Sequence, residues 1–370
     1  MRLRPGSIQA IESINASEAI AAVEPAGIEV PYGPGWVDAL QARLSRLPWP
    51  VWATCAGVWL ALVGVEYTGQ VLAGTASDAP WPFILLAFAL APYAFAFMDF
   101  LDRAAGSALD GLGEPPPSSG WPGGVRYHLM TKPVLGTAIA TVAGLTFGLL
   151  QRYAVTAPYL EQLGFARSGW LHYYELIAVP ITAWALIGVL IYHVLRQVGI
   201  VRQIYAQLED IDAFSVRRFQ AFSTYSALMA LGVLAVVYLW LALYPEVNVS
   251  SVEQLNVAAI VLLSVLGFFV FLMPLWGAHL RLAAARAERI VYVTRLLDTV
   301  LGQVHASVEA GRNLEAGSAH ETIKALTAEL QLVERASTWP WEASLFRGFA
   351  TAVLLPLALY VAQQVLGRVF

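Results

Sequence analysis

The sequence predicts an all-α polytopic membrane protein with about seven transmembrane helices and a helical hairpin outside the membrane. Three observations support this prediction. The 370 residues are 58% hydrophobic and only 13% charged, with a mean hydropathy of +0.61, whereas soluble domains carry about 25% charged residues. Seven apolar segments each approach or exceed the roughly 20 residues that a helix needs to cross a bilayer. Basic residues gather in alternate connections between these segments.

The seven apolar segments mark the expected membrane spans. Only a helix satisfies every backbone N–H and C=O group of so short a crossing in lipid. Trp-Pro triplets that contain Trp49, Trp81 and Trp339 open three of the segments, and indole rings suit the depth of the lipid headgroups. The segments are residues 49–73, 82–101, 133–154, 171–195, 219–244, 255–278 and 342–367.

The basic residues predict the orientation of the chain. With the N-terminus in the cytosol, 19 of the 22 lysine and arginine side chains fall on the cytosolic side, and Arg152, Arg167 and Arg368 fall outside. Positive charge concentrates in the cytosolic loops of membrane proteins. The alternation favours an odd number of spans, with the C-terminus outside. Because 20 of the basic residues are arginine, a composition typical of GC-rich prokaryotes, we expect a prokaryotic plasma or inner membrane.

The chain then divides into four parts. Residues 1–46 form a cytosolic N-terminal arm, in which acidic residues interrupt the apolar ones and argue against a signal peptide. Residues 47–279 contain six transmembrane helices, the fourth of which extends into the cytosol over residues 196–213. Residues 280–338 form a cytosolic helical hairpin, and residues 339–370 form the seventh transmembrane helix.

The hairpin is predicted from a helical pattern that continues past the sixth span. Ile290, Leu297 and Val304 are seven residues apart, as in a coiled-coil stripe. A return helix is expected to carry a second apolar face that includes Leu326 and Val333. Residues 280–338 hold seven basic and seven acidic side chains, a balance typical of a solvated surface. The pattern predicts a coiled-coil-like stalk that is continuous with the membrane helices.

Three ionisable residues fall near the outer ends of spans. Glu66 lies in the first span, and His172 and Glu175 lie three residues apart at the start of the fourth. Ionisable groups in spans are costly and often functional, so these residues are candidates for an outer ion path. The alternative is an interfacial position from which the side chains reach water. Three candidates make no metal ligand set, and no metal site is predicted.

A second group of ionisable residues falls near the inner ends of the spans. They could form ion pairs that act as a gate, or they could be ordinary charges at the membrane edge. The residues are Asp99, Asp102, Arg103, His193, Arg196 and His279.

Small residues recur every four positions in the third span. Gly136, Ala140, Gly144 and Gly148 form a small-xxx-small ladder, which lets helices approach closely. We expect this span to lie centrally or at a contact between subunits.

No catalytic or cofactor-binding signature is present. The sequence has no phosphate-binding loop, no HExxH, no GxSxG and no glycine-rich dinucleotide loop. We therefore expect no catalytic residues, no cofactor and no enzymatic activity. A net charge of −4 argues against nucleic acid as a partner.

The C-terminal half carries one family resemblance. Met-Pro-Leu-Trp-Gly-Ala-His at 273–279, the stalk, and Ser-Thr-Trp-Pro-Trp at 337–341 together resemble a group of uncharacterised prokaryotic multi-span membrane proteins. The resemblance covers roughly the C-terminal half of the chain, and its motifs are short. It implies a fold and no activity.

Two functions follow from these observations. The first is a membrane channel or transport-type protein, oligomeric in the bilayer, with gating or assembly coupled to the cytosolic stalk. The alternative is a non-transporting scaffold or sensor that binds a protein partner through the stalk. The spans are largely apolar at mid-depth, which favours a scaffold or a hydrophobic gate over an open polar conduit.

Overall fold

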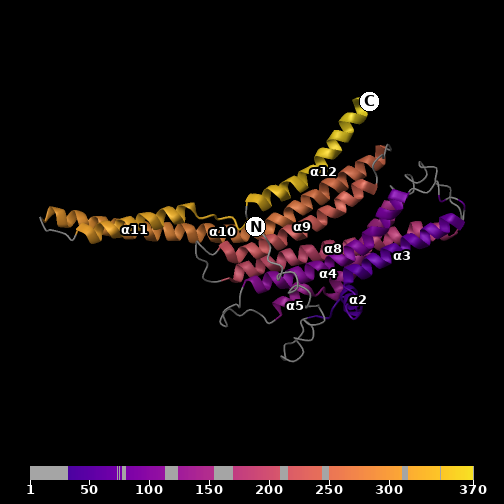
Figure 1. The fold of residues 1–370 in the computed structure, drawn as a ribbon, viewed down its shortest axis with the longest axis horizontal. Helices are drawn as coiled ribbons and strands as arrows, with labels where there is room; N and C mark the ends of the chain where they lie inside the picture. Colours follow the sequence, from indigo (N-terminus) through magenta and orange to yellow (C-terminus); the bar gives the residue numbers. More distant parts are fainter. Residues whose placement is uncertain are drawn as a thin grey trace.

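The computed structural model describes residues 32–72, 74, 76, 81–112, 124–153, 170–208, 216–243, 250–310, 316–341 and 343–369. This part of the chain is helical and contains no β-strand beyond one isolated bridge between Pro34 and Pro133. Long helices pack into a bundle, and a two-helix hairpin projects from one end of it (Figure 1).

Six helices within the described residues are long and apolar enough to cross a membrane. This confirms the prediction of an all-helical chain with several apolar helices. A further helix, α12 (Ala343–Val369), lies at the predicted seventh position, but its described apolar part, Ser344–Leu355, is shorter than a crossing, so the number seven stays a prediction. The six are α3 (Val51–Leu72), α4 (Trp81–Gly111), α6 (Val134–Gln151), α8 (Trp170–Gln207), α9 (Val216–Leu243) and α10 (Ser250–Glu309).

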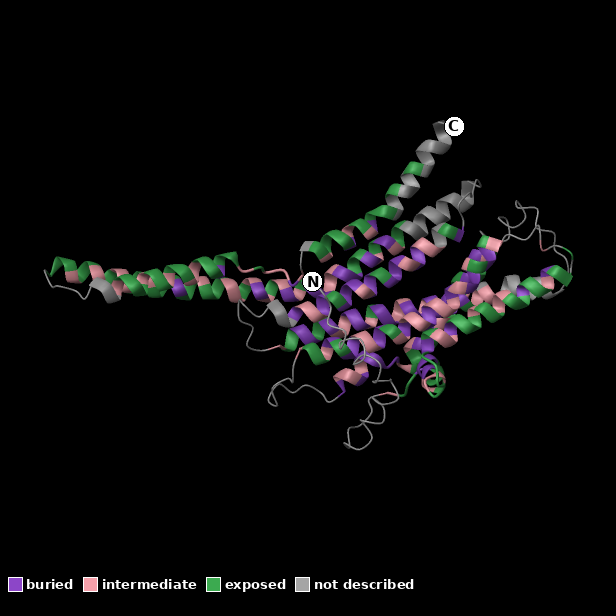
Figure 2. Cartoon of the chain, viewed as in Figure 1, coloured by how far each residue is buried: buried purple, intermediate pink, exposed green. Residues whose placement is uncertain are grey.

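Helix α4 is central to the bundle. It packs against both α8 and α9, while α6 covers α8 and α10 covers α9. Met98, Leu101 and Ala105 recur at helical spacing along α4 and are completely buried, so they form part of the core seen in Figure 2. Helix α3 packs on α4 and leaves most of its side chains exposed. In a bilayer, such exposed apolar faces contact lipid.

Two helices extend beyond the predicted spans. Helix α4 runs to Gly111 rather than ending near residue 101, because small helix-forming residues such as Ala104, Ala105 and Ala108 follow the apolar core. Helix α8 continues to Gln207, and residues 209–213 of its predicted extension lie outside the described residues. A short helix, α5 (Val125–Met130), lies in the connection between α4 and α6.

The hairpin begins as a direct continuation of α10. This helix is 60 residues long without interruption, which corresponds to about 90 Å at 1.5 Å per residue. Helix α11 (Ala316–Arg335) packs back along it (Figure 1). Val293 and Val333 are completely buried in the hairpin, and an Arg289–Glu329 ion pair of 2.6 Å joins its two helices. We call the face of the bundle from which it projects the hairpin side.

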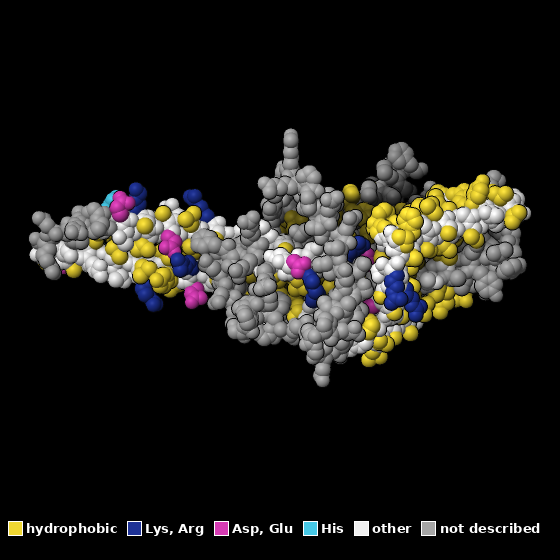
Figure 3. Space-filling model, turned by 60° about the horizontal axis from the view of Figure 1, so that its bottom comes forward, with side chains coloured by type: hydrophobic (Ala, Val, Ile, Leu, Met, Phe, Trp, Pro, Cys, Tyr) yellow, Lys and Arg dark blue, Asp and Glu magenta, His cyan; other side chains and the backbone are white. Residues whose placement is uncertain are grey.

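The surface character changes along the molecule. Charged side chains of both signs are interspersed on the hairpin, whereas hydrophobic side chains cover the far end of the bundle (Figure 3). The change is expected where helices leave lipid and enter water, because only the lipid-facing part can leave apolar side chains uncovered.

Candidate functional site

The described residues contain one buried group of ion pairs, centred on Lys132. The side chain of Lys132 is 0% exposed. Its Nζ donates to Asp102 Oδ2 at 2.7 Å, to Asp38 Oδ1 at 3.0 Å and to Gln41 Oε1 at 3.3 Å. An ammonium group has three donors, so these three acceptors satisfy it completely. We refer to Asp38, Gln41, Asp102, Lys132 and His193 as the Lys132 cluster.

Asp102 links Lys132 to His193. One carboxylate oxygen of Asp102 accepts from Lys132, and the other lies 2.8 Å from His193 Nε2. Asp102 comes from α4 and His193 from α8, so the cluster joins two helices of the bundle core. With a neutral imidazole, one cation faces two carboxylates and one negative charge is uncompensated. A proton on His193 would cancel that charge.

Asp38 attaches the helix α2 (Trp36–Leu44) to the membrane bundle. Its Oδ2 accepts from the backbone N–H of Lys132 at 2.8 Å and from that of Gly35 at 3.2 Å. The Gly35 N–H also donates to Lys132 O at 2.7 Å. A Cβ on residue 35 would lie 2.7 Å from Thr137 Oγ1 and 3.0 Å from Lys132 O, so only glycine allows this close approach.

The charges around Lys132 determine its protonation. Burial works against the ammonium, but the neighbouring Asp102 and Asp38 carboxylates outweigh it and raise the pKa of Lys132 above its ordinary value of 10.5. Lys132 is therefore a permanent cation at physiological pH. His193 is the other member of the cluster that can carry a cationic charge, because its imidazole can take up a proton.

Four buried polar atoms in or beside the cluster have no hydrogen-bond partner among the described residues: His193 Nδ1, Gln41 Nε2, Gln197 Oε1 and Tyr225 Oη. Gln197 follows His193 by one helical turn, and Tyr225 of α9 lies within electrostatic range of Asp102. A buried polar atom without a partner costs about 1–3 kcal/mol. Each such atom in a native structure requires an explanation, such as a functional role or a bound water or ion.

A second layer of contacts lies on the hairpin side of the cluster. Arg196 donates to Thr131 O at 2.6 Å and to the hydroxyl of Tyr32, and its guanidinium lies 5.3 Å from the centre of the Tyr32 ring. Burial raises the pKa of Tyr32 to about 12 although Arg196 opposes the shift, so the phenol remains neutral. Tyr127 donates to Tyr32 O at 2.6 Å. These contacts connect α5, α8 and the segment before α2.

The structure brings together some of the predicted inner residues and separates others. Asp102 and His193 belong to the Lys132 cluster. Asp99 and Arg103 form a partly buried ion pair one helical turn apart on α4. His279 lies elsewhere, on α10, where its ring stacks on Trp339 with centroids 3.9 Å apart. Three members of the cluster, Asp38, Gln41 and Lys132, were not identified as site residues from the sequence.

Glu66, a predicted outer residue, is 3% exposed in α3 and accepts a 2.7 Å hydrogen bond from Gln70 Nε2. The side chains of His172 and Glu175 lie outside the described residues, so an outer ion path stays a prediction. Where side chains are described, no group of three His, Cys, Asp or Glu residues is arranged to hold a metal ion.

The small-residue ladder of α6 contacts α8 within the same chain. A Cβ added to Gly144 would lie 2.2 Å from Trp184 O, and one added to Gly136 would lie 2.0 Å from the Tyr192 hydroxyl. Gly148 likewise contacts Trp184, and Ala140 O lies close to Gly188 of α8. The ladder lets α6 and α8 approach closely, whereas a role in a contact between subunits stays a prediction.

Comparison with known proteins adds no assignment: no protein family, no curated protein and no solved structure matches this chain.

Proposed function

We propose that this protein is a channel or transport-type membrane protein whose working site is the Lys132 cluster. The observation that carries the proposal is the buried arrangement of Asp38, Asp102 and Lys132 with His193, in which one negative charge lacks a cation. Buried charges in membrane helices are expensive and mark ion pathways or proton relays. A proton or a cation that reaches this site would restore electrical balance.

The positions of the cluster residues suggest how charge couples to conformation. The cluster connects α2, α4, α8 and the segment that leads into α6. Protonation of His193 changes its hydrogen bonding, since the imidazolium has two donors and no acceptor. The contact with the Asp102 carboxylate then joins two opposite charges, whereas with a neutral imidazole only the acceptor is charged. We infer that the charge state of His193 changes the strength with which α8 is held to α4.

Orientation and assembly belong to the same proposal. The distribution of basic residues supports a cytosolic location of the hairpin side and of the N-terminus. A prokaryotic plasma or inner membrane fits the composition. An oligomeric assembly would cover more of the apolar surface of helices such as α3 and α6, and the hairpin could couple gating or assembly to the spans.

Flux measurement in liposomes tests the proposal. We expect purified protein to give a pH-dependent flux of protons or alkali cations, monitored with dyes inside the vesicles. Asp102→Asn and His193→Gln should abolish the flux or its pH dependence, because each removes one half of the pair that links α4 to α8.

The control for the flux experiment is Asp110→Asn. Asp110 also lies on α4, but its side chain is 60% exposed and pairs with Arg126 outside the cluster. This variant should conduct like the wild type. Flux no greater than that of protein-free vesicles, at acidic and at neutral pH and with every common ion, would remove the transport proposal.

The alternative is a scaffold or sensor, and the exposed apolar side chains of the hairpin favour it. Val291, Tyr292 and Leu332 are 59%, 52% and 62% exposed on α10 and α11. Exposed apolar patches often mark interaction surfaces. A scaffold would give no flux. A protein partner from native membranes would bind the wild type but not the double variant that carries Val291→Asp and Leu332→Asp.

A further inference from the structure

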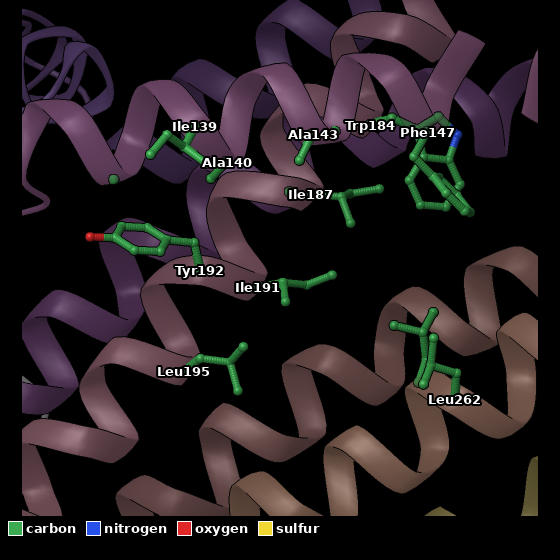
Figure 4. Close-up of a pocket in the computed structure, with 14 residues that line it drawn as sticks. Ile139, Ala140, Ala143, Phe147, Trp184, Ile187, Ile191, Tyr192, Leu195 and Leu262 are labelled. Atoms are coloured by element: carbon green, nitrogen blue, oxygen red, sulfur yellow. The ribbon is translucent and has the colours of Figure 1, made fainter. Parts of the chain in front are cut away.

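An apolar groove of about 640 Å³ runs between α6, α8 and α10. Figure 4 shows the α6 and α8 side chains that line one wall and Leu262 of α10 on the opposite wall. Nearly all of its lining is apolar. The lining residues used below are Ile139, Ala143, Phe147, Trp184, Ile191 and Leu195.

The groove has the length of one half of a bilayer. On α8 it extends from Trp184 to Leu195, which corresponds to roughly 16 Å at about 1.5 Å per residue. The hydrocarbon core is about 30 Å thick, so one leaflet contributes about half of that. Leu195 lies toward the hairpin side, because Arg281 of α10 donates to Leu208 O just beyond α8 at 2.6 Å.

The outer wall of the groove belongs to a lipid-facing surface. On α6, Leu135 and Val142 are 73% and 62% exposed, and Ala143 is exposed beside them. A membrane helix with this pattern faces hydrocarbon. The groove is therefore open to lipid chains rather than to water.

A polar pocket of about 280 Å³ continues along α8 where the groove ends. Tyr32, His128 and Arg196 line it, together with Gln203 and Gln207. Gly188 and Tyr192 of the groove and Arg196, Gln203 and Gln207 of the pocket follow one another at steps of four or seven residues, so they share one face of α8. Tyr192 in the groove also lies within electrostatic range of Tyr32 in the pocket.

The pocket has uncompensated positive charge. Among the described residues, Arg196 forms no ion pair with a carboxylate; its hydrogen bonds go to Thr131 O and to the Tyr32 hydroxyl. A guanidinium has five donors, so donors remain for a ligand. The side-chain amides of Gln203 and Gln207 add neutral donors. His128 stays neutral, because burial and then the Arg196 charge lower its pKa.

We propose that this face of α8 binds a membrane phospholipid with a net negative headgroup. One acyl chain occupies the groove, and the phosphate contacts Arg196 in the pocket. The charge of Arg196 selects an anionic headgroup, and the adjoining groove at hydrocarbon depth selects a lipid rather than a free phosphate. The site is separate from the Lys132 cluster and does not depend on the proposed transport.

The test uses native mass spectrometry of the full chain in detergent, titrated with dioleoyl phosphatidylglycerol and with dioleoyl phosphatidylcholine. We expect the wild type to prefer the anionic lipid. Arg196→Gln should weaken its binding roughly tenfold, which is about 1.4 kcal/mol, and should remove the preference, since it removes the charge that contacts the phosphate. Arg196→Lys should retain part of the preference. The matched control is Arg202→Gln, which changes an exposed arginine of the same helix that does not line the pocket.

Filling the groove tests the acyl-chain part of the proposal. Ala143→Phe should reduce binding of the anionic lipid by roughly tenfold, whereas Val142→Phe, at the neighbouring position that does not line the groove, should leave it unchanged. Leu195→Trp narrows the same groove from α8 and replaces Ala143→Phe if that variant does not fold. Thermal melting in detergent verifies that each variant is folded.

Three results would overturn the proposal. The first is equal affinity of the wild type for both lipids. The second is wild-type affinity in folded groove-filling variants. The third is displacement of the lipid by inorganic phosphate alone, which would show that the pocket binds a free anion.

Discussion

Replacement of Lys132 by methionine tests whether the cluster holds the bundle together. The substitution keeps the length and apolar stem of the side chain and removes its charge. Asp38 and Asp102 are 3% and 4% exposed in their ion pairs with Lys132, so both carboxylates would lose their cation while remaining away from water. Removal of one partner from a buried ion pair costs about 3–5 kcal/mol, because it leaves an uncompensated buried charge.

The loss of stability caused by Lys132→Met depends on pH in a defined way. The pKa of Lys132 is raised above 10.5 in the folded chain, so its contribution to stability is complete below about pH 10.5 and is lost as the pH rises through the folded-state pKa. In Lys132→Met, protonation of the carboxylates at acidic pH relieves part of the cost. We therefore expect the largest difference between wild type and variant at neutral pH and a smaller one at either extreme.

Thermal unfolding in detergent provides the measurement. The single cysteine, Cys55, is buried in α3, so a thiol-reactive fluorophore reports its exposure on heating. We expect the Lys132→Met midpoint to fall by on the order of 5 °C or more. Asp102→Asn in the same background should restore part of the loss, because it removes one orphaned charge.

The control comes from the other lysine of the chain. Lys324 lies exposed on α11, and Lys324→Met should melt like the wild type. If Lys132→Met also melted like the wild type at neutral pH, the cluster would not contribute to stability as we argue. An amine-reactive reagent supplies an independent check: it should modify Lys324 in the folded protein and Lys132 only after unfolding.

Two further predictions concern packing. Gly144→Ala should destabilise the contact between α6 and α8 by about 1–3 kcal/mol, because its Cβ would lie 2.2 Å from Trp184 O. The control Gly57→Ala in α3 should be neutral or stabilising, because its Cβ meets nothing within 4 Å. The Cys55 assay compares the unfolding midpoints of the two variants, and equal midpoints would contradict the close approach of α6 and α8. Val333→Asp should open the hairpin and speed its limited proteolysis, because Val333 is completely buried. The control Leu332→Asp should not, because Leu332, at the adjacent position, is 62% exposed. Equal cleavage rates of the two variants would contradict the packing of α10 on α11.

Most helices could be predicted from the sequence for a simple physical reason. A long apolar run in lipid must satisfy its backbone groups internally, so its length and composition determine its conformation. The continuation of α10 was predictable as well, because Ile290, Leu297 and Val304 keep the helical spacing after the charged residues begin. The extension of α4 to Gly111 was missed because alanines and glycines carry little periodic signal.

The Lys132 cluster could not be predicted in the same way. Lys132 is 94 residues from Asp38 and 30 from Asp102, and Asp102 is 91 from His193, so no local spacing places them together. The prediction of orientation treated Lys132 as one more basic residue in a loop. The sequence did contain a signal for the cluster. Lys132 is one of only two lysines and lies between Thr131 and Pro133, directly before a span, and Asp102 lies at the end of another span on the same side.

The sequence alone therefore determined which segments are helices and which parts of them suit lipid or water, because these properties depend on neighbours within one or two helical turns. The tertiary structure decided which charges are buried together, since only the packing of α2, α4 and α8 brings Asp38, Asp102 and His193 to Lys132. It also decided that the small residues of α6 contact α8 and that an apolar groove meets Arg196, which has no carboxylate partner among the described residues, along one face of that helix. Such features depend on contacts between distant segments, and no local spacing in a single sequence specifies which segments meet.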